Sequence, residues 1–368
     1  MQKKIIVAAI AAVISAPAFA ENSNITVYGT LHADLESVKN DKPLANTASS
    51  LNRIVSNASR LGFKGSEDLG DGLSAIYQLE AQFDLTNTGG TPFASTRNSN
   101  VGLKGNFGTV FYGNWDTPYK VAHNKVELFD NTHTASALDI TGRVGTQDGN
   151  ASFNTRQKNV LQYWTPNYSG FQARLAYAPD NAKKSTVAVA TGGDKSVWSL
   201  SAVYENDLLY GAYAYESHKD ALAGVGSTVS LTDSANRLVG AYKFGNGQVG
   251  LTYERLSVAK AAASTATASR NGWELSGKYK FGASNVGAFY TRAGDLGGVA
   301  NTGANQYSLR YGYNLSKRTE VYGFYTQLSN DAAASYNFSA NTTVASAAGA
   351  AGLGAKLSGL GLGLAHSF

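Results

Sequence analysis

The sequence contains no cysteine, a single methionine and only six prolines among its 368 residues. The absence of cysteine excludes disulfide bonds as a source of stability. Charged residues make up only 15% of the chain, and no basic cluster with interleaved aromatic residues suggests a nucleic-acid partner. Beyond residue 20, no apolar run approaches the ~18 residues that a membrane-spanning helix needs. The class of the protein must therefore be inferred from other patterns in the sequence.

The N-terminus has the three parts of a secretory signal peptide. Lys3 and Lys4 precede an apolar run over 5–14, and residues 15–20 end in the form Ala-Phe-Ala. The run is too short to span a bilayer as a helix, and the alternative is a buried N-terminal helix. We therefore expect a signal peptide at 1–20 and a mature domain at 21–368. The mature net charge is +5 − 2 = +3, because the signal peptide holds two lysines and no acid.

Glycine and aromatic residues are abundant, with 40 glycines, 21 tyrosines and 15 phenylalanines. These numbers are high for a soluble enzyme and are typical of β-structure with many turns. Membrane β-barrels place aromatic residues at both membrane interfaces. The composition therefore favours a β-protein and agrees with a membrane barrel.

Several segments alternate apolar and polar residues with the period of a β-strand. In 25–35, Leu31 and Leu35 share one face, and His32 and Asp34 share the other. The other clear examples are 73–85, 171–177, 306–313 and 360–368. A soluble β-sandwich shows the same alternation, so the period alone does not show whether the apolar faces meet lipid or one another.

The connections between the predicted strands alternate in length. Seven short turns lie at 66–72, 106–108, 166–170, 206–207, 245–247, 281–284 and 316–318. Eight longer segments lie at 38–52, 86–96, 116–156, 180–195, 217–235, 259–270, 293–304 and 330–350. They separate about sixteen strands, and an even strand number with short turns at one end is what outer-membrane barrels require. With the signal peptide, this predicts an all-β, 16-stranded antiparallel transmembrane β-barrel; a soluble β-protein is the alternative.

The third long segment, 116–156 (loop 3), is the longest of these connections. It follows Trp115, is polar, and is closed by Arg156. A structureless loop of about forty residues is uncommon in a compact domain and is usually functional. We expect loop 3 to fold inward into the barrel lumen, where it would set what passes.

Several segments resemble general porins of the neisserial and betaproteobacterial type. They are 59–73 (Ser-Arg-Leu-Gly-Phe-Lys-Gly-Ser-Glu-Asp-Leu-Gly-Asp-Gly-Leu) with 78–80, then 101–110, 313–322 and 361–368 (Gly-Leu-Gly-Leu-Ala-His-Ser-Phe). The resemblance spans the mature chain and implies a homotrimeric, 16-stranded porin β-barrel at 21–368, with loop 3 folded inward. It also implies that Phe368 is a signal for the outer-membrane assembly machinery; an interfacial aromatic residue is the simpler interpretation.

The resemblance further implies a ladder of arginines on one wall of the constriction. Matched motif to motif, Arg60, Arg97 and Arg156 take its three positions. Strand alternation places Arg60 and Lys64 on the lumen face. Counting back from Leu103 instead places Arg97 on the outward face, unless a bulge or a strand start follows that residue.

A fourth arginine, Arg174, has lumen parity and extends the predicted basic wall. The opposing acids are expected mid-loop, at Glu127 and Asp130, where the resemblance places the constriction carboxylates. Asp116 and Asp139 are further candidates that could instead cap loop structure. We expect the carboxylates near Glu127 and Asp130 to face the arginine that closes loop 3.

These features predict an outer-membrane general diffusion porin for ions and small hydrophilic solutes, with a weak preference for anions. The partners expected are two further copies of the chain, outer-membrane lipid and the assembly machinery. The alternatives are a substrate-specific porin, which would carry an aromatic track on its lumen wall, and an outer-membrane barrel enzyme. The five histidines have no catalytic spacing, and no motif suggests a cofactor or a metal site.

Overall fold

A computed structural model describes residues 24–43, 49–86, 93–129, 132–145, 152–179, 196–219, 232–261, 264–338 and 352–368. The expected signal peptide at 1–20 lies outside the described residues, and so does Asp130.

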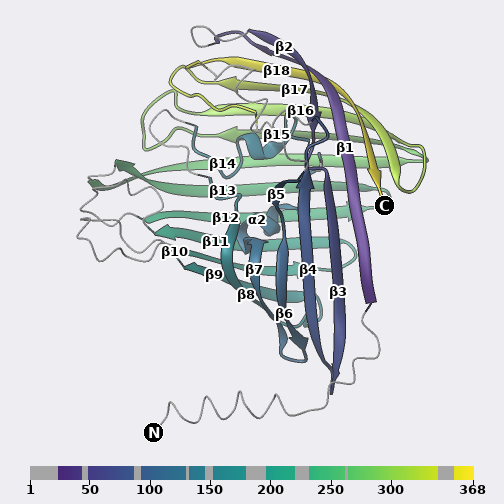
Figure 1. Cartoon of the computed structure of the whole chain (residues 1–368). Helices are drawn as coiled ribbons and strands as arrows, with labels where there is room; N and C mark the ends of the chain where they lie inside the picture. Colours follow the sequence, from purple (N-terminus) through teal and green to yellow (C-terminus); the bar gives the residue numbers. More distant parts are fainter. Residues whose placement is uncertain are drawn as a thin grey trace.

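The described residues form one antiparallel sheet of eighteen strands that curves into a closed barrel (Figure 1). The strands are β1(Asn24–Asn40), β2(Ser50–Ser56), β3(Arg60–Gly70), β4(Leu73–Phe83), β5(Phe93–Thr96), β6(Ser99–Gly105), β7(Gly108–Asp116), β8(Arg156–Trp164), β9(Phe171–Pro179), β10(Ser196–Glu205), β11(Leu209–Lys219), β12(Thr232–Phe244), β13(Gly247–Ala261), β14(Ser264–Phe281), β15(Ser284–Ala293), β16(Ala304–Asn314), β17(Thr319–Asn330) and β18(Lys356–Ser367). The barrel closes where β1 pairs with β18, from Thr30 opposite Ser367 to Asn40 opposite Leu357.

Two of the barrel strands are interrupted, so the eighteen segments make sixteen barrel strands (18 − 2 = 16). β2 and β3 both pair with β1 and are one strand broken at residues 57–59. β5 and β6 both pair with β4 and are one strand broken at residues 97–98. The predicted 16-stranded antiparallel barrel is therefore confirmed.

The apolar faces of the strands point outward. In β1, Leu31 and Leu35 are 40% and 59% exposed, whereas His32 and Asp34 between them are buried. A soluble sandwich would show the reverse, because its apolar faces pack together. The polar faces line a lumen that loop 3 partly fills, which is the arrangement of a barrel in lipid.

Outward-facing aromatic residues gather toward both ends of the barrel wall. Toward the long-loop end they are Tyr177, Trp198, Tyr253, Trp273, Tyr290, Tyr307 and Tyr325, and toward the short-turn end they are Phe171, Tyr242, Phe244, Tyr279, Phe281, Tyr311 and Tyr313. Aromatic side chains suit both membrane–water interfaces, because one end of a tyrosine or tryptophan is apolar and the other is polar.

The seven short turns lie where the sequence predicts them. In the first, Asp71 and Gly72 both have positive φ, 51° and 76°, as an Asp-Gly hairpin of the mirror-image type I requires. The prediction of a long connection at 259–270 is wrong, because β13 runs to Ala261 and β14 begins at Ser264. That segment is rich in alanine, serine and threonine, whose small polar character looks like a loop although its residues pair across the hairpin.

Loop 3 is folded rather than structureless, and it lies inside the ring of strands (Figure 1). It contains α2(Pro118–His123) and the 3₁₀ helix η1(Ala137–Asp139). The Thr117 hydroxyl accepts a hydrogen bond from the Lys120 N–H, and Pro118 occupies the first turn, where its missing N–H is not needed. No helix among the described residues is long and apolar enough to cross a membrane.

Candidate pore constriction

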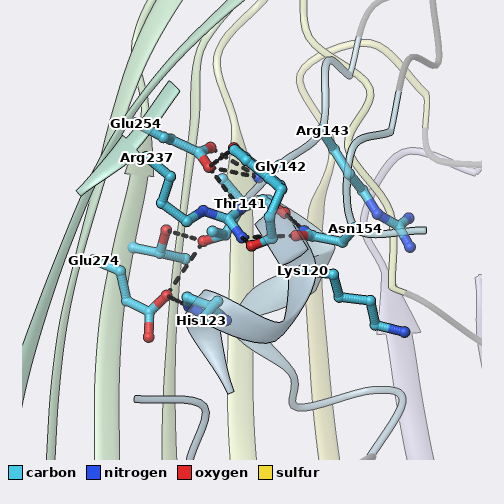
Figure 2. Close-up of polar contacts among 12 residues, drawn as sticks. Lys120, His123, Thr141, Gly142, Arg143, Asn154, Arg237, Glu254 and Glu274 are labelled. Carbon is cyan, nitrogen blue, oxygen red and sulfur yellow. Dashed lines mark hydrogen bonds and ion pairs between the residues drawn. The ribbon is translucent and has the colours of Figure 1, made fainter. Parts of the chain in front are cut away.

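Loop 3 is held against one side of the barrel by the buried carboxylate of Glu254, in β13 (Figure 2). Its oxygens accept hydrogen bonds from the backbone N–H of Gly142 at 2.8 and 3.0 Å and from the Tyr119 hydroxyl at 3.2 Å. Arg237 of β12 and Arg270 of β14 pair with the same carboxylate at 2.9 and 3.0 Å. A charge buried this deeply is tolerated only when it is paired and hydrogen-bonded. Loop 3 therefore completes a charge network that begins in the wall.

A second attachment lies on the neighbouring strand, at Glu274 of β14. The Nε2 atom of His123, at the end of α2, lies 2.6 Å from a Glu274 carboxylate oxygen. The Thr141 hydroxyl donates to the same oxygen at 3.3 Å. Two distant parts of loop 3 thus meet at one wall side chain, while Lys120 points away from it (Figure 2).

Further contacts fix the remainder of the described loop on the same side. Phe129 packs edge-on against Phe289 of β15, with ring centres 5.1 Å apart, and the Thr134 hydroxyl donates to Glu36 of β1 at 2.8 Å. Other hydrogen bonds join the loop to β10, β11, β13, β15 and β16. The wall left facing the passage is therefore formed mainly by β3, β4, β6, β7, β8 and β9.

The first basic cluster on this facing wall is organised by Glu80 of β4. One Glu80 oxygen lies 2.6 Å from Nε of Arg97, and the other lies 4.0 Å from Nε of Arg60. The Tyr28 hydroxyl donates to Glu80 at 3.0 Å. Both arginine side chains keep part of their surface exposed, 13% for Arg97 and 24% for Arg60. One carboxylate thus serves two guanidinium groups, and the cluster keeps a net positive charge.

Arg97 reaches the lumen because its strand is interrupted. β5 ends at Thr96 and β6 begins at Ser99, so the alternation restarts between them. The Arg97 backbone N–H still donates to the carbonyl oxygen of Glu80, at 2.8 Å. The outward parity counted back from Leu103 is therefore wrong, and the alternative of a strand start after Arg97 is correct.

The second basic cluster surrounds Asp116, the last residue of β7. Its Oδ1 atom lies 2.8 Å from Nζ of Lys120 and 3.2 Å from a terminal nitrogen of Arg156. Nε of Arg156 donates to Asn98 at 2.6 Å, and the Asn98 amide donates to Asp116 at 3.1 Å. Asn98 directly follows Arg97, so the two clusters are continuous.

Two more cations stand on the same wall. Lys64 of β3 is exposed, with its Nζ 5.2 Å from the ring centre of Tyr28. The guanidinium of Arg174 in β9 lies over the ring of Trp164 at 4.8 Å, and its Nε donates to Gln172 at 2.9 Å. Within the described part of the chain, neither cation is paired with a carboxylate.

A barrel with this strand number, an inward third loop and a basic lumen wall agrees with the matches to known proteins. The model of a family described as Gram-negative porin matches residues 7–333. The chain belongs to this porin family. Like its relatives, it is a non-enzymatic channel of the outer membrane.

Individual porins are similar over the whole chain or over large parts of it. Outer membrane porin protein 32 of Delftia acidovorans is 27% identical over 369 residues, which cover 100% of both chains. The major outer membrane protein P.IB of Neisseria gonorrhoeae is 30% identical over 212 residues, covering 56% of this chain and 55% of that protein. The solved structure of an anion-selective porin from Comamonas acidovorans has a TM-score of 0.79 and 26% identity, covering 94% of this chain and 100% of that chain.

The predicted acids of this porin lie in different settings. Asp116 lies at the basic wall, as described above. Glu127 is half-buried and accepts hydrogen bonds within loop 3, from the Phe129 N–H at 3.1 Å and the Ser136 hydroxyl at 3.3 Å. Asp139 is fully buried and accepts from the Gln306 amide at 3.1 Å.

Among the described residues, Arg156 forms no ion pair with Glu127, and the expectation that it faces the mid-loop acids across the lumen stays a prediction. Arg156 is held by Asp116 and Asn98 instead, because both ends of loop 3 return to the same pair of strands, where β7 and β8 meet. That Glu127 acts as a constriction acid stays a prediction.

Three residues of the basic wall were not among the predicted site residues: Glu80, Asn98 and Lys120. Glu80 could have been found, since the Asp71-Gly72 turn fixes the hairpin register and brings Glu80 opposite Gly62, two residues from Arg60. Lys120 and Asn98 depend on where loop 3 begins its helix and where β5 breaks, which the alternation alone does not give.

The C-terminal Phe368 closes the barrel against β1. It exchanges two backbone hydrogen bonds of 3.1 Å with Gly29, and its ring covers Gly29, where a side chain would collide with it. Phe368 itself is 43% exposed, as an interfacial aromatic residue would be. Its role as an assembly signal stays a prediction.

Proposed function

We propose that this general porin passes ions and small hydrophilic solutes with a weak preference for anions. The observation that carries the proposal is the charge of the wall opposite loop 3. Among the described residues, five cations of this wall and Lys120, at the start of loop 3 beside it, stand against two acids, a surplus of four positive charges: Arg60, Lys64, Arg97, Arg156, Arg174 and Lys120 against Glu80 and Asp116.

The electric field of this surplus positive charge acts over a short range. The Debye length is ~8 Å at physiological ionic strength, so the field of the wall is felt across a narrow gap and fades in a wide vestibule. An anion in the gap is attracted without needing a binding pocket, and a dipolar solute is oriented by the same field. Solutes then diffuse down their gradients.

Zero-current potentials test this proposal. Purified, refolded protein in a planar bilayer with a potassium chloride gradient should give a potential of the sign expected for chloride preference. The preference should weaken as ionic strength rises, because the wall charges are screened. A cation-preferring sign would contradict the proposal, whereas the absence of conductance would contradict the channel itself.

We infer that the chain assembles as a homotrimer, since porins of this family are typically trimeric. Single-channel recordings should show closure in three equal steps, and cross-linking in detergent should stop at three subunits. Independent single steps would speak against the trimer.

We infer, too, that residues 1–20 are a signal peptide removed on export, with the porin barrel at 21–368. The order of charged, apolar and small residues supports cleavage after Ala20. N-terminal sequencing of the outer-membrane protein should begin at Glu21, and retention of Met1 would contradict cleavage.

A further inference from the structure

An aromatic patch lies on the lumen wall beside the basic clusters. It consists of Phe111 and Trp115 from β7 and Trp164 from β8. The ring centres are 5.1 Å apart for Phe111 with each tryptophan and 6.3 Å apart for the two tryptophans, all edge to face. Phe111 is buried, whereas both tryptophans keep part of their surface exposed. Phe111 therefore fixes the two indoles, and the indoles are what a solute can touch.

The patch faces the passage rather than lipid. Phe111 and Trp164 alternate along their strands with Tyr112 and Tyr163, which are exposed on the outer face. The chain has four tryptophans in all, and the other two, Trp198 and Trp273, stand outward on the barrel. Trp115 also packs on the buried cluster of Val160, Ala176 and Ala178, and the part of the indole surface that stays exposed on the pore wall is apolar surface that a passing solute can contact.

A cavity of about 400 Å³ adjoins the patch. The aromatic rings form one side of it, and polar side chains of the preceding strands form the other: Lys64, Gln78 and Asn100. The lining strands β1, β3, β4, β6, β7 and β8 each pair with the next one in this order, so the cavity is a concave stretch of lumen wall with an aromatic and a polar half.

Both ends of the aromatic patch are positively charged. Lys64 lines the cavity with its exposed ammonium group. At the far side, the guanidinium of Arg174 lies over the Trp164 ring at 4.8 Å. The Trp164 N–H donates to Gln162 at 3.0 Å, which fixes the plane of the ring. The surface thus offers partly exposed indole between two cations.

We propose that this surface is a weak binding subsite for single-ring aromatic carboxylates. The solute ring lies against the exposed indole surface of Trp115 and Trp164, since aromatic pairs prefer offset or edge-to-face contact. Its carboxylate lies toward Lys64, with the amides of Gln78 and Asn100 as further donors. The proposal rests on the proposed pore function and adds a preferred solute class to it.

The test compares three carboxylates on the wild-type channel. Benzoate, cyclohexanecarboxylate and acetate carry the same charge. Benzoate and cyclohexanecarboxylate also have similar size, and they differ in that only benzoate has an aromatic face. Open-channel conductance and chloride preference are measured first, and then the chloride current is recorded while each acid is titrated. Benzoate should reduce the current saturably, with a half-blocking concentration about three- to tenfold lower than that of cyclohexanecarboxylate.

Variants locate the block. Trp164→Leu and Lys64→Met should each weaken the block by benzoate severalfold, while the lipid-facing Trp198→Leu should leave it unchanged. Equal block by benzoate and cyclohexanecarboxylate in the wild-type channel would overturn the proposal without any variant. A block that survives Trp164→Leu would overturn the location. A channel that conducts with anion preference but shows no block would overturn this inference alone, whereas one that does not conduct would overturn the proposed function.

Discussion

Arg60 and Glu80 show how single charges define the constriction. Arg60 keeps a quarter of its side chain exposed, at 4.0 Å from a carboxylate that is already engaged at 2.6 Å by Arg97. Its charge is therefore only partly neutralised. We therefore expect Arg60 to act on passing ions more than on the stability of the barrel.

We expect Arg60→Glu to shift the zero-current potential toward cations. A unit charge ~8 Å from an ion acts with about 0.5 kcal/mol in water. Reversing it should change the anion-to-cation permeability ratio by about threefold after screening over one Debye length. The matched control is Lys317→Glu, the same charge reversal on an exposed short turn, and it should leave the ratio unchanged. Equal shifts in both variants would mean that total charge, and not the wall, sets the preference.

Glu127 gives loop 3 a titratable group near neutral pH. Burial is the main cause that raises the pKa of its carboxyl to about 7, with repulsion from Glu274 adding to the rise and attraction to His123 opposing it. A raised carboxyl pKa means that the neutral acid is favoured, so the charge is present above pH 7 and lost below it.

Lowering the pH from 8 to 6 should therefore increase chloride preference, by up to about twofold for the loss of one negative charge. The measurement is the zero-current potential at each pH. Glu127→Gln should show the higher preference already at pH 8 and a smaller step between the two pH values. A step of equal size in that variant would assign the titration to another group.

At the scale of elements, loop 3 behaves as a part of the wall rather than as a flap. Its backbone and side chains hydrogen-bond to the buried carboxylates of Glu254 and Glu274, and its apolar residues pack into a buried cluster with β15 and β17. The inward position of the loop thus provides hydrogen-bond partners for carboxylates that the wall buries.

Replacing Glu254 by glutamine should loosen this attachment. The change leaves Arg237 and Arg270 buried beside a neutral amide, and breaking a buried pair in this way costs about 3–5 kcal/mol. Thermal unfolding in detergent, followed by circular dichroism, should shift to lower temperature, and open-channel current noise should rise. The control is Glu205→Gln, whose partly exposed pairs with Lys125 and Lys243 are expected to contribute under about 1 kcal/mol. If the Glu254→Gln variant keeps the wild-type unfolding temperature and the wild-type current noise, the attachment of loop 3 does not depend on this carboxylate.

At the scale of the whole molecule, the C-terminus both closes the barrel and ends the chain. The backbone of Phe368 pairs with Gly29, and its ring covers the same residue. The hydrogen bonds that close the barrel come from the main chain, which any residue could provide. The aromatic ring of Phe368 is therefore available for recognition by the assembly machinery.

Phe368→Ala should therefore lower the yield of trimer in the outer membrane severalfold in cells, because the assembly machinery is expected to read the ring. The same variant refolded in detergent should give channels of normal conductance. Western blots of membrane fractions and bilayer recordings measure the two effects. Failure of the variant to refold in detergent would show that the Phe368 ring is needed to close the barrel. A normal yield in cells would contradict the role of the ring as an assembly signal.

The sequence by itself determined the barrel. Alternation of apolar and polar residues, seven short turns and a signal-like N-terminus are local patterns, and each depends only on residues near in the chain. They place Arg60 and Lys64 on the lumen face and predict the length of loop 3. The hairpin register from Asp71-Gly72 was also available, and with it the place of Glu80.

The tertiary structure alone decided the constriction. The break between β5 and β6 turns Arg97 inward, and the alternation of the surrounding residues does not record where that break falls. The partners of loop 3 include residues more than 150 positions away, such as Glu274 for His123. Closure of the barrel puts these groups together, and the free energy of burying a charge then selects which acid meets which base. Pairing of β7 with β8 brings Arg156 to Asp116 and lets two tryptophans separated by 48 residues (164 − 115 − 1 = 48) form one surface on the pore wall.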